Sequence, residues 1–356
     1  MDNTTSFNIK KIWLLFINSV RMHVILLGVI TVYILISVFV ADLFDVGSQT
    51  SITLYTQELG ILSSCFIICF FCGHALYVTF RIRPKRLFEH YFNDLRDNYF
   101  SGQRFFTAAP VLLFFPLFFS AFTSFKNILP VINPYSWDQP LAQMDAIMHG
   151  GIMPWQWLHT IVGSPIITSG INFFYQLWFF VMYAIFFWQA FSLRTPLLRM
   201  RFLLSFIGIW ILFGTVCAIG LSSAGPCYYG RITGLNDPFQ PLLQYLNTTN
   251  NTFPILALDV QEHLWKTYTT KAIGLGGGIS AMPSMHVATS TLFTLLGWRS
   301  SRALGIILTL FLVIIMIGSV HLGWHYAIDG YVAIIGTWLV WLGTGWVLNR
   351  HPKLIE

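Results

Sequence analysis

Charged residues are scarce in this sequence. Only 10% of the 356 residues are Asp, Glu, Lys or Arg, whereas a soluble domain usually has about 25%. Hydrophobic residues make up 55% of the chain and aromatic residues 17%, which is typical of helices that contact lipid and end in interfacial belts. The net charge is +6, but the basic residues lie in short clusters between apolar runs. We therefore expect membrane-protein loops and no nucleic-acid partner.

Cysteine is also rare, and neither repeats nor an independent soluble domain are visible. The five cysteines match no zinc-ligand spacing, so we expect no metal site. Cys217 and Cys227 could pair if the outer compartment is oxidising. No cleaved signal peptide is evident, because the first apolar run begins about twenty residues in and is long enough to span a bilayer. We expect one membrane domain over residues 1–356.

Long apolar runs are abundant instead, and they predict an all-α polytopic membrane bundle. A span needs roughly 17–25 apolar residues, which gives about eight spans, with six to eight as the range. The sixth is short for a full span. The expected spans are Met22–Val40, Gly60–Phe80, Phe105–Phe125, Ile166–Phe191, Phe202–Leu221, Ser284–Leu296, Ala303–Val320 and Asp329–Val347. Residues 126–165 and 222–283 are expected to form outer interfacial helices and loops that roof a site.

The distribution of basic residues orients these spans. With the N-terminus inside, all but four of the twenty Lys and Arg residues fall on inner segments, so both termini should be cytoplasmic. The membrane would be a bacterial inner membrane or one of the eukaryotic secretory pathway. A cation on the outer side opposes this bias and is a candidate for anion binding, although a solvated loop charge is the simpler interpretation. The four exceptions are Lys126, Arg231, Lys266 and Lys271.

A glycine-rich stretch leads into Pro-Ser-Met-His at residues 283–286. Glycines such as Gly278 let a backbone approach a ligand closely, and Pro283 followed by Ser284 indicates a helix start. The N–H groups and positive dipole of such a start favour phosphate, and His286 lies in the first turn. The alternative is a membrane loop with a surface histidine.

A second cluster of ionisable residues occupies positions 321–329. Asp329 follows His325 by four positions, which places both on one helix face. A carboxylate beside an imidazole fixes its tautomer and leaves the other nitrogen available to attack or to accept a proton. Ionisable residues at the mouth of a membrane helix are costly and usually functional. One inner loop and one returning span lie between the sixth and the eighth span, so both of these spans should begin on the outer side. His286, His325 and Asp329 should therefore meet at the same membrane face.

These motifs resemble those of a known family. Residues 283–286 match the P-S-x-H motif of the type 2 phosphatidic acid phosphatase superfamily, and His325 to Asp329 match its H-x-x-x-D. The flanking residues, with Ser-Ala-Gly-Pro-Cys-Tyr-Tyr at 223–229, are most similar to the inositol phosphorylceramide synthase branch. The resemblance covers roughly the last 140 residues, and we expect a catalytic core at 202–348.

The resemblance implies an enzyme that cleaves or transfers a phosphate ester of a lipid on the non-cytoplasmic face. His325 would form a phosphohistidine, Asp329 would orient it, and His286 would protonate the departing oxygen. Ser284 and nearby N–H groups would bind phosphate oxygens. No cofactor or metal is implied. The substrate would be a lipid phosphate or phosphodiester, and the acceptor would be water or a hydroxyl of a lipid such as ceramide or of a glycan.

The sequence also departs from the superfamily pattern. Many members have Ser-Arg seven and six residues before the nucleophile, where this chain has Gly318 and Ser319. We also find no K-x6-R-P motif. The missing cation could be Arg231, which we favour, or Lys266 or Lys271. His321 could add a donor, or it could serve packing.

Other functional classes remain open. A transporter or flippase could use the His and Asp residues as a proton relay, although internal repeats would then be expected. A scaffold that kept the fold without catalysis is a further alternative, and two His with one Asp could in principle bind zinc. Asp145 and His149 lie at helical spacing in an outer segment, and we expect an exposed surface pair there rather than a head-group contact.

Overall fold

The computed structural model describes residues 9–99 and 101–352, and every regular element in this part of the chain is helical. Six helical stretches are long and apolar enough to cross a membrane. This confirms the all-α bundle and lies at the lower end of the predicted range. The six are α2 (Val24–Leu43), α5 (Gly102–Ile132), α8 (Pro165–Phe191), the stretch Pro196–Gly220 that begins with α9 (Pro196–Ile211), α15 (Arg302–His321) and α16 (Ala327–Arg350).

Two of the eight expected spans are not among these six. The second corresponds to α3 (Leu54–Tyr77), several of whose side chains lie outside the described part of the chain. The sixth corresponds to α14 (Met285–Ser300), which has only 16 residues, or about 24 Å at 1.5 Å per residue. It is short because it begins below the roof, inside the protein.

Helix α14 lies at the centre of the bundle. It contacts α8, α9, α15 and α16, and the side chains of its middle turns, from Val287 to Phe293, are buried. A helix without a separate polar face is typical of such a central position. Its N-terminal end therefore opens onto a site enclosed by neighbouring helices rather than onto lipid.

The N-terminal helices pack against the side of this bundle. Helix α2 and helix α1 (Ile9–Met22) contact α5. The buried Arg199 on α9 donates to the carbonyls of Gln189 and Thr107, at 2.9 and 3.1 Å, and to Nε2 of His23 at 2.8 Å. Because each of these groups would be costly to bury unpaired, the network fixes the junction of α1 and α2 against α5, α8 and α9.

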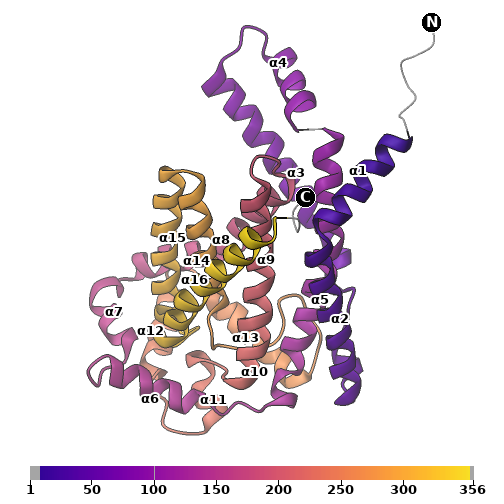
Figure 1. Cartoon of the computed structure of the whole chain (residues 1–356). Helices are drawn as coiled ribbons and strands as arrows, with labels where there is room; N and C mark the ends of the chain where they lie inside the picture. Colours follow the sequence, from indigo (N-terminus) through magenta and orange to yellow (C-terminus); the bar gives the residue numbers. More distant parts are fainter. Residues whose placement is uncertain (1–8, 100, 353–356) are drawn as a thin grey trace, which may run out of the picture.

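Short helices form the expected roof at one end of the bundle. They lie opposite α4 (Leu87–Asp94) and the α14–α15 connection (Figure 1). Helix α5 continues to Ile132, so Lys126 lies in the last turns of a long helix and not in an outer loop. Cys217 and Cys227 are free thiols, and the conditional disulfide is not formed. The roof consists of α6 (Asp138–Met148), α7 (Pro154–Val162), α11 (Tyr229–Thr233), α12 (Gln240–Asn250) and α13 (Leu256–Thr270).

Candidate active site

His286 occupies the first turn of α14, as predicted. Ser284 is the N-cap of this helix, and its hydroxyl accepts the N–H of Val287 at 3.4 Å. The His286 ring packs against two aromatic rings of α8, with centroid distances of 4.5 Å to Tyr175 and 4.0 Å to Trp178. The indole N–H of Trp178 is in turn bonded to the Thr289 hydroxyl of α14 at 2.8 Å. These contacts restrict the rotamer of His286.

His325 lies just before α16 and is held in one tautomer. Its Nδ1 is 2.8 Å from the carbonyl oxygen of Ala281. Because a carbonyl can only accept, Nδ1 carries the proton and the lone pair lies on Nε2. The Asp329 carboxylate is 3.3 Å from the same Nδ1. The ring is therefore oriented by two acceptors, and its side chain is only 7% exposed.

Asp329 is fully buried in the first turn of α16. Its Oδ2 accepts the N–H of Tyr326 at 3.1 Å, while Oδ1 has no hydrogen-bond partner among the described residues. The i, i+4 spacing to His325 brings the two side chains together, as the sequence predicted. An ionised carboxylate here is stabilised by the N–H donor at the helix start and by the adjacent imidazole.

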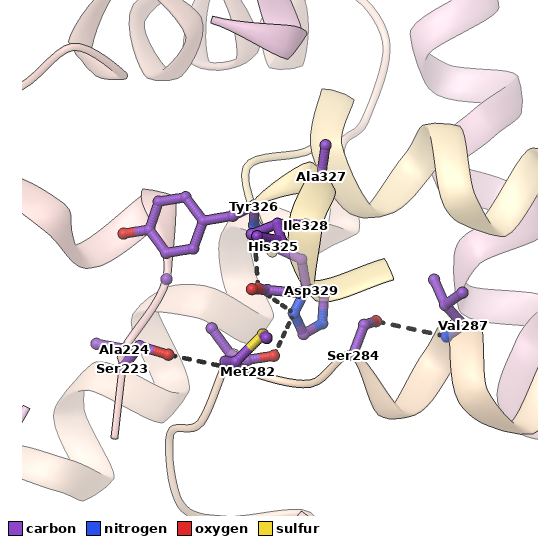
Figure 2. Close-up of polar contacts among 12 residues, drawn as sticks. Ser223, Ala224, Met282, Ser284, Val287, His325, Tyr326, Ala327, Ile328 and Asp329 are labelled. Atoms are coloured by element: carbon purple, nitrogen blue, oxygen red, sulfur yellow. Dashed lines mark hydrogen bonds and ion pairs between the residues drawn. The ribbon is translucent and has the colours of Figure 1, made fainter. Parts of the chain in front are cut away.

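The two histidine motifs come together in space. The ring centroids of His286 and His325 are 6.1 Å apart, and the N–H of Ser284 donates to the Asp329 carbonyl at 3.3 Å. Figure 2 shows Ser284 at the start of one helix beside His325 and Asp329 at the start of another. The structure therefore places the three predicted catalytic residues at one end of the bundle, next to the roof.

A third segment, residues 222–225, connects the two motifs. The Ser223 carbonyl accepts the N–H of Ala281 at 2.9 Å, and its hydroxyl accepts the N–H of Met282 at 3.2 Å (Figure 2). Gly225 has φ +104°, and a Cβ there would lie 2.6 Å from the carbonyl oxygen of Trp324. Only glycine allows this loop to approach the residue before His325 so closely. The loop thereby aligns the Ala281 carbonyl that accepts the hydrogen bond from Nδ1 of His325.

The predicted phosphate-binding residues have different surroundings. Ser284 is buried, and capping of α14 uses its oxygen as an acceptor but not its proton. Gly278 has φ +81°, and a Cβ there would lie 2.6 Å from the backbone of Lys126. The glycine is therefore required for contact between this loop and α5. Lys271 is the C-cap of α13, with φ +53°.

Arg231 and His321 have protein partners of their own. The guanidinium of Arg231 is 2.9 Å from Glu262 and lies over the ring of Trp265, on the exposed face of the roof. His321 is buried, and its Nε2 is bonded to the Thr168 hydroxyl at 2.9 Å. Among the described residues, both thus contact the roof and α8, and no hydrogen bond or ion pair joins them to His286 or His325.

Lys126 is the cation that sequence reasoning undervalued. It is half-buried near the end of α5, and its backbone packs against Gly278 in the loop that leads into α14. It has no carboxylate partner among the described residues. A signal for it was present in the sequence: Asn133 and Pro134 follow Lys126 at the spacing of K-x6-R-P, with Asn in place of Arg.

A cavity of about 350 Å³ lies between the end of α5 and the roof. Asn127, Lys271 and Gly278 line it. Two of the predicted substrate-binding residues, Lys271 and Gly278, therefore border the same cavity. The amide nitrogen of Asn127 is buried without a hydrogen-bond partner among the described residues. A lysine and an unpaired amide donor favour a ligand with acceptor oxygens.

The structure also accounts for glycine at position 318, the first of the two departures from Ser-Arg. A Cβ on Gly318 would lie 2.8 Å from the ring of Tyr175, and that ring packs on His286. Ser319 is buried, and its carbonyl accepts the N–H of His325 at 2.9 Å. An aromatic ring of α8 therefore occupies the space that a longer side chain at 318 would need.

One expectation for the outer segment was wrong. Asp145 and His149 do not form an exposed surface pair, because Asp145 is only 1% exposed and accepts the N–H groups of Ala327 and Ile328. Nδ1 of His149 donates to the Asp145 carbonyl at 2.7 Å, so its Nε2 accepts a hydrogen bond from the Tyr331 hydroxyl at 2.9 Å. Helical spacing alone does not reveal which face of a short helix is covered by the bundle.

The fold defines a polytopic integral membrane protein of the helical type. The sequence profile of the PAP2 superfamily matches residues 139–344, which is more than half of the chain, and the protein belongs to this superfamily. Membership supports a phosphatase- or phosphotransferase-type activity in general. No curated protein and no solved structure matches the chain. The expected core at 202–348 lies almost entirely within the matched region, which begins earlier.

Proposed function

We propose that this protein cleaves or transfers the phosphate ester of a lipid through a phosphohistidine on His325. The observation that carries the proposal is the bond from Nδ1 of His325 to the Ala281 carbonyl. Since this bond keeps the proton on Nδ1, the Nε2 lone pair is available as a nucleophile at neutral pH. Asp329 then balances the positive charge that the ring acquires when it is phosphorylated.

The reaction has two balanced steps. In the first, Nε2 of His325 attacks phosphorus, the P–N bond forms, and the P–O bond to the leaving group breaks while His286 donates its proton to the departing oxygen. In the second, water or an acceptor hydroxyl attacks phosphorus, gives its proton to His286, and the P–N bond breaks. The His286–His325 ring separation of 6.1 Å leaves room for a phosphoryl group between a nucleophile and an acid.

Lys126 supplies positive charge in this proposal. The transition state spreads negative charge over the phosphoryl oxygens, and a cation placed in advance stabilises it. The backbone of Lys126 packs against Gly278 in the loop that leads to Ser284, whereas Arg231 is paired with Glu262. The first N–H groups of α14 and the Ser284 hydroxyl proton complete the oxyanion contacts. Lys126 thus replaces Arg231 as the favoured cation.

The cavity beside Lys126 holds the polar head of the substrate. Its volume of about 350 Å³ is within the usual range for small-molecule sites, and Lys271, Asn127 and Gly278 line it. Because the cavity is at the end of α5 that faces the roof, the head group would enter from the outer leaflet. With the cytoplasmic termini indicated by the basic loops, chemistry occurs on the non-cytoplasmic face.

Turnover by the detergent-solubilised protein tests this proposal. We would measure phosphate or head-group release from lipid phosphomonoesters, diphosphates and phosphodiesters, with and without a hydroxyl acceptor such as ceramide. His325→Ala should abolish turnover, while His263→Ala, an exposed histidine on α13, should retain it. Product that requires the acceptor identifies a transferase, and product in its absence identifies a phosphatase. A folded wild type that turns over none of these compounds would contradict the proposal.

A further inference from the structure

Two buried carboxylates on α6 contact the segments that build the proposed site. Asp138 accepts the N–H groups of Ala224 and Gly225, at 2.9 and 2.8 Å, and the hydroxyl proton of Tyr326 at 2.8 Å. It is 1% exposed. One carboxylate thus holds the 222–225 loop and the residue that directly follows His325.

Asp145 lies two turns further along the same helix and holds the start of α16. Its two oxygens accept the N–H groups of Ala327 and Ile328 at 2.7 and 2.9 Å. These N–H groups have no acceptor within their own helix, because they belong to its first turn. A carboxylate at this position also interacts favourably with the helix dipole. The neighbouring residue of this turn is Asp329.

Neither carboxylate forms an ion pair with Lys or Arg in the described part of the chain. Their charge is compensated by backbone N–H groups and by one phenol, which are donors with fixed positions. Charge-assisted hydrogen bonds of this kind are short and directional. A spacing of seven residues places both side chains on the same face of α6, so this helix contacts both segments at once.

We propose that Asp138 and Asp145 are positioning residues that set the geometry of His325 and Asp329; this inference rests on the function proposed above. Asp138 fixes the 222–225 loop, whose Ser223 carbonyl binds the N–H of Ala281. The Ala281 carbonyl in turn accepts the hydrogen bond from Nδ1 of His325. Asp145 fixes the helix turn that presents Asp329 to the same nitrogen.

The inference predicts a specific response to the loss of one acceptor oxygen. In Asp138→Asn or Asp145→Asn, an amide NH2 group faces a backbone N–H, and one donor loses its partner. The 222–225 loop or the start of α16 then shifts, and the His325 ring loses its fixed orientation. Because a displacement of about 1 Å at reacting groups costs about 10²-fold in rate, kcat should fall at least tenfold while KM changes less than threefold.

Chemical modification of His325 tests the inference without requiring turnover. The rate of carbethoxylation of His325 by diethyl pyrocarbonate would be followed by peptide mass spectrometry, with exposed His263 as the internal reference. His325 is only 6% exposed, so loss of the clamp should raise its rate at least threefold, and the rate at His263 should not change. Asp259→Asn, an exposed carboxylate on α13, is the matched control.

Two further variants separate positioning from a general loss of stability. Leu26→Ala opens a cavity beside α2, where Leu26 is fully buried, and should lower Tm without changing the His325 rate or kcat. Tyr326→Phe removes only the phenol that donates to Asp138 and should raise the His325 rate even if the Asp variants fail to fold. An unchanged His325 rate in the Asp variants and in Tyr326→Phe, or an equal change in Leu26→Ala, would overturn the inference. An inactive wild type whose His325 rate still responds would contradict the proposed function alone.

Discussion

Gly318 offers a quantitative test of how tightly the proposed acid is held. A Cβ at this position would be 2.8 Å from Cδ2 of Tyr175 and 3.1 Å from Cγ2 of Ile171. Ordinary contacts begin at 3.4 Å, so Gly318→Ala requires the Tyr175 ring to move by about 0.6 Å. Tyr175 is 2% exposed and cannot move into solvent. The displacement is therefore transmitted to the His286 ring, whose centroid is 4.5 Å from that of Tyr175.

Two effects of this substitution can be separated. Overpacking a core usually costs about 1–3 kcal/mol, which should lower Tm. A shift of about 1 Å in a catalytic group costs about 10²-fold, so a shift of about 0.6 Å should reduce kcat roughly tenfold, with little change in KM. Gly170→Ala on α8 is the matched control, because nothing lies within 4 Å of its Cβ position.

The assay is steady-state turnover of the best lipid phosphate, combined with Tm in the same detergent. We expect Gly318→Ala to lose kcat and Gly170→Ala to keep it, with equal or higher Tm because alanine favours the helix. A Gly318→Ala protein with lowered Tm but full kcat would refute the reasoning. It would mean that the Tyr175 ring yields without moving His286.

Three further predictions address the cations and the buried carboxylates. Lys126→Gln should lower kcat about 10²-fold because an electrostatic stabiliser is lost, whereas Lys266→Gln, an exposed cation on α13, should keep it within twofold; equal losses would argue against a special role for Lys126. Lys271→Ala should raise KM severalfold with kcat unchanged, and loss of kcat alone would contradict head-group binding in the cavity. Burial raises the pKa of Asp138 and Asp145 above the ordinary 3.8 even though their N–H donors oppose this shift. Their stability contribution is thus present below pH 3.8 and lost as pH rises through the raised pKa values. The Tm of the wild type relative to the double Asn variant should fall as pH rises from about 4, and a relative rise would show that the hydrogen bonds outweigh burial.

The sequence predicted the bundle and the meeting of His286, His325 and Asp329 because the signals for both are local. Apolar runs of sufficient length define spans in any context, and His325 with Asp329 needs only one turn of helix. His286 follows Ser284 in a motif that also caps its helix. Topology then required both helices to begin at the same end of the bundle, which the structure confirms.

The sequence did not predict contacts made between distant segments. Apolar runs place Lys126 in an outer loop, whereas in the structure α5 continues past it to Ile132. The burial of Asp145 depends on the docking of α6 against the start of α16, and the spacing of Asp145 and His149 is equally compatible with a surface helix. The position of Arg231 after a turn favours it as the missing cation. The sequence does not reveal its ion-pair partner Glu262, because that residue lies 31 residues away in the chain.

The central claim is that His325 carries the phosphoryl group, and rapid-quench labelling tests it directly. Wild type would be mixed with excess substrate labelled at phosphorus, quenched in base within one turnover, and digested for mass spectrometry. We predict a base-stable, acid-labile phosphate on His325 that is absent in His325→Ala and fully retained in His263→Ala. Product formation without any label on His325, or label on another residue, would contradict the account.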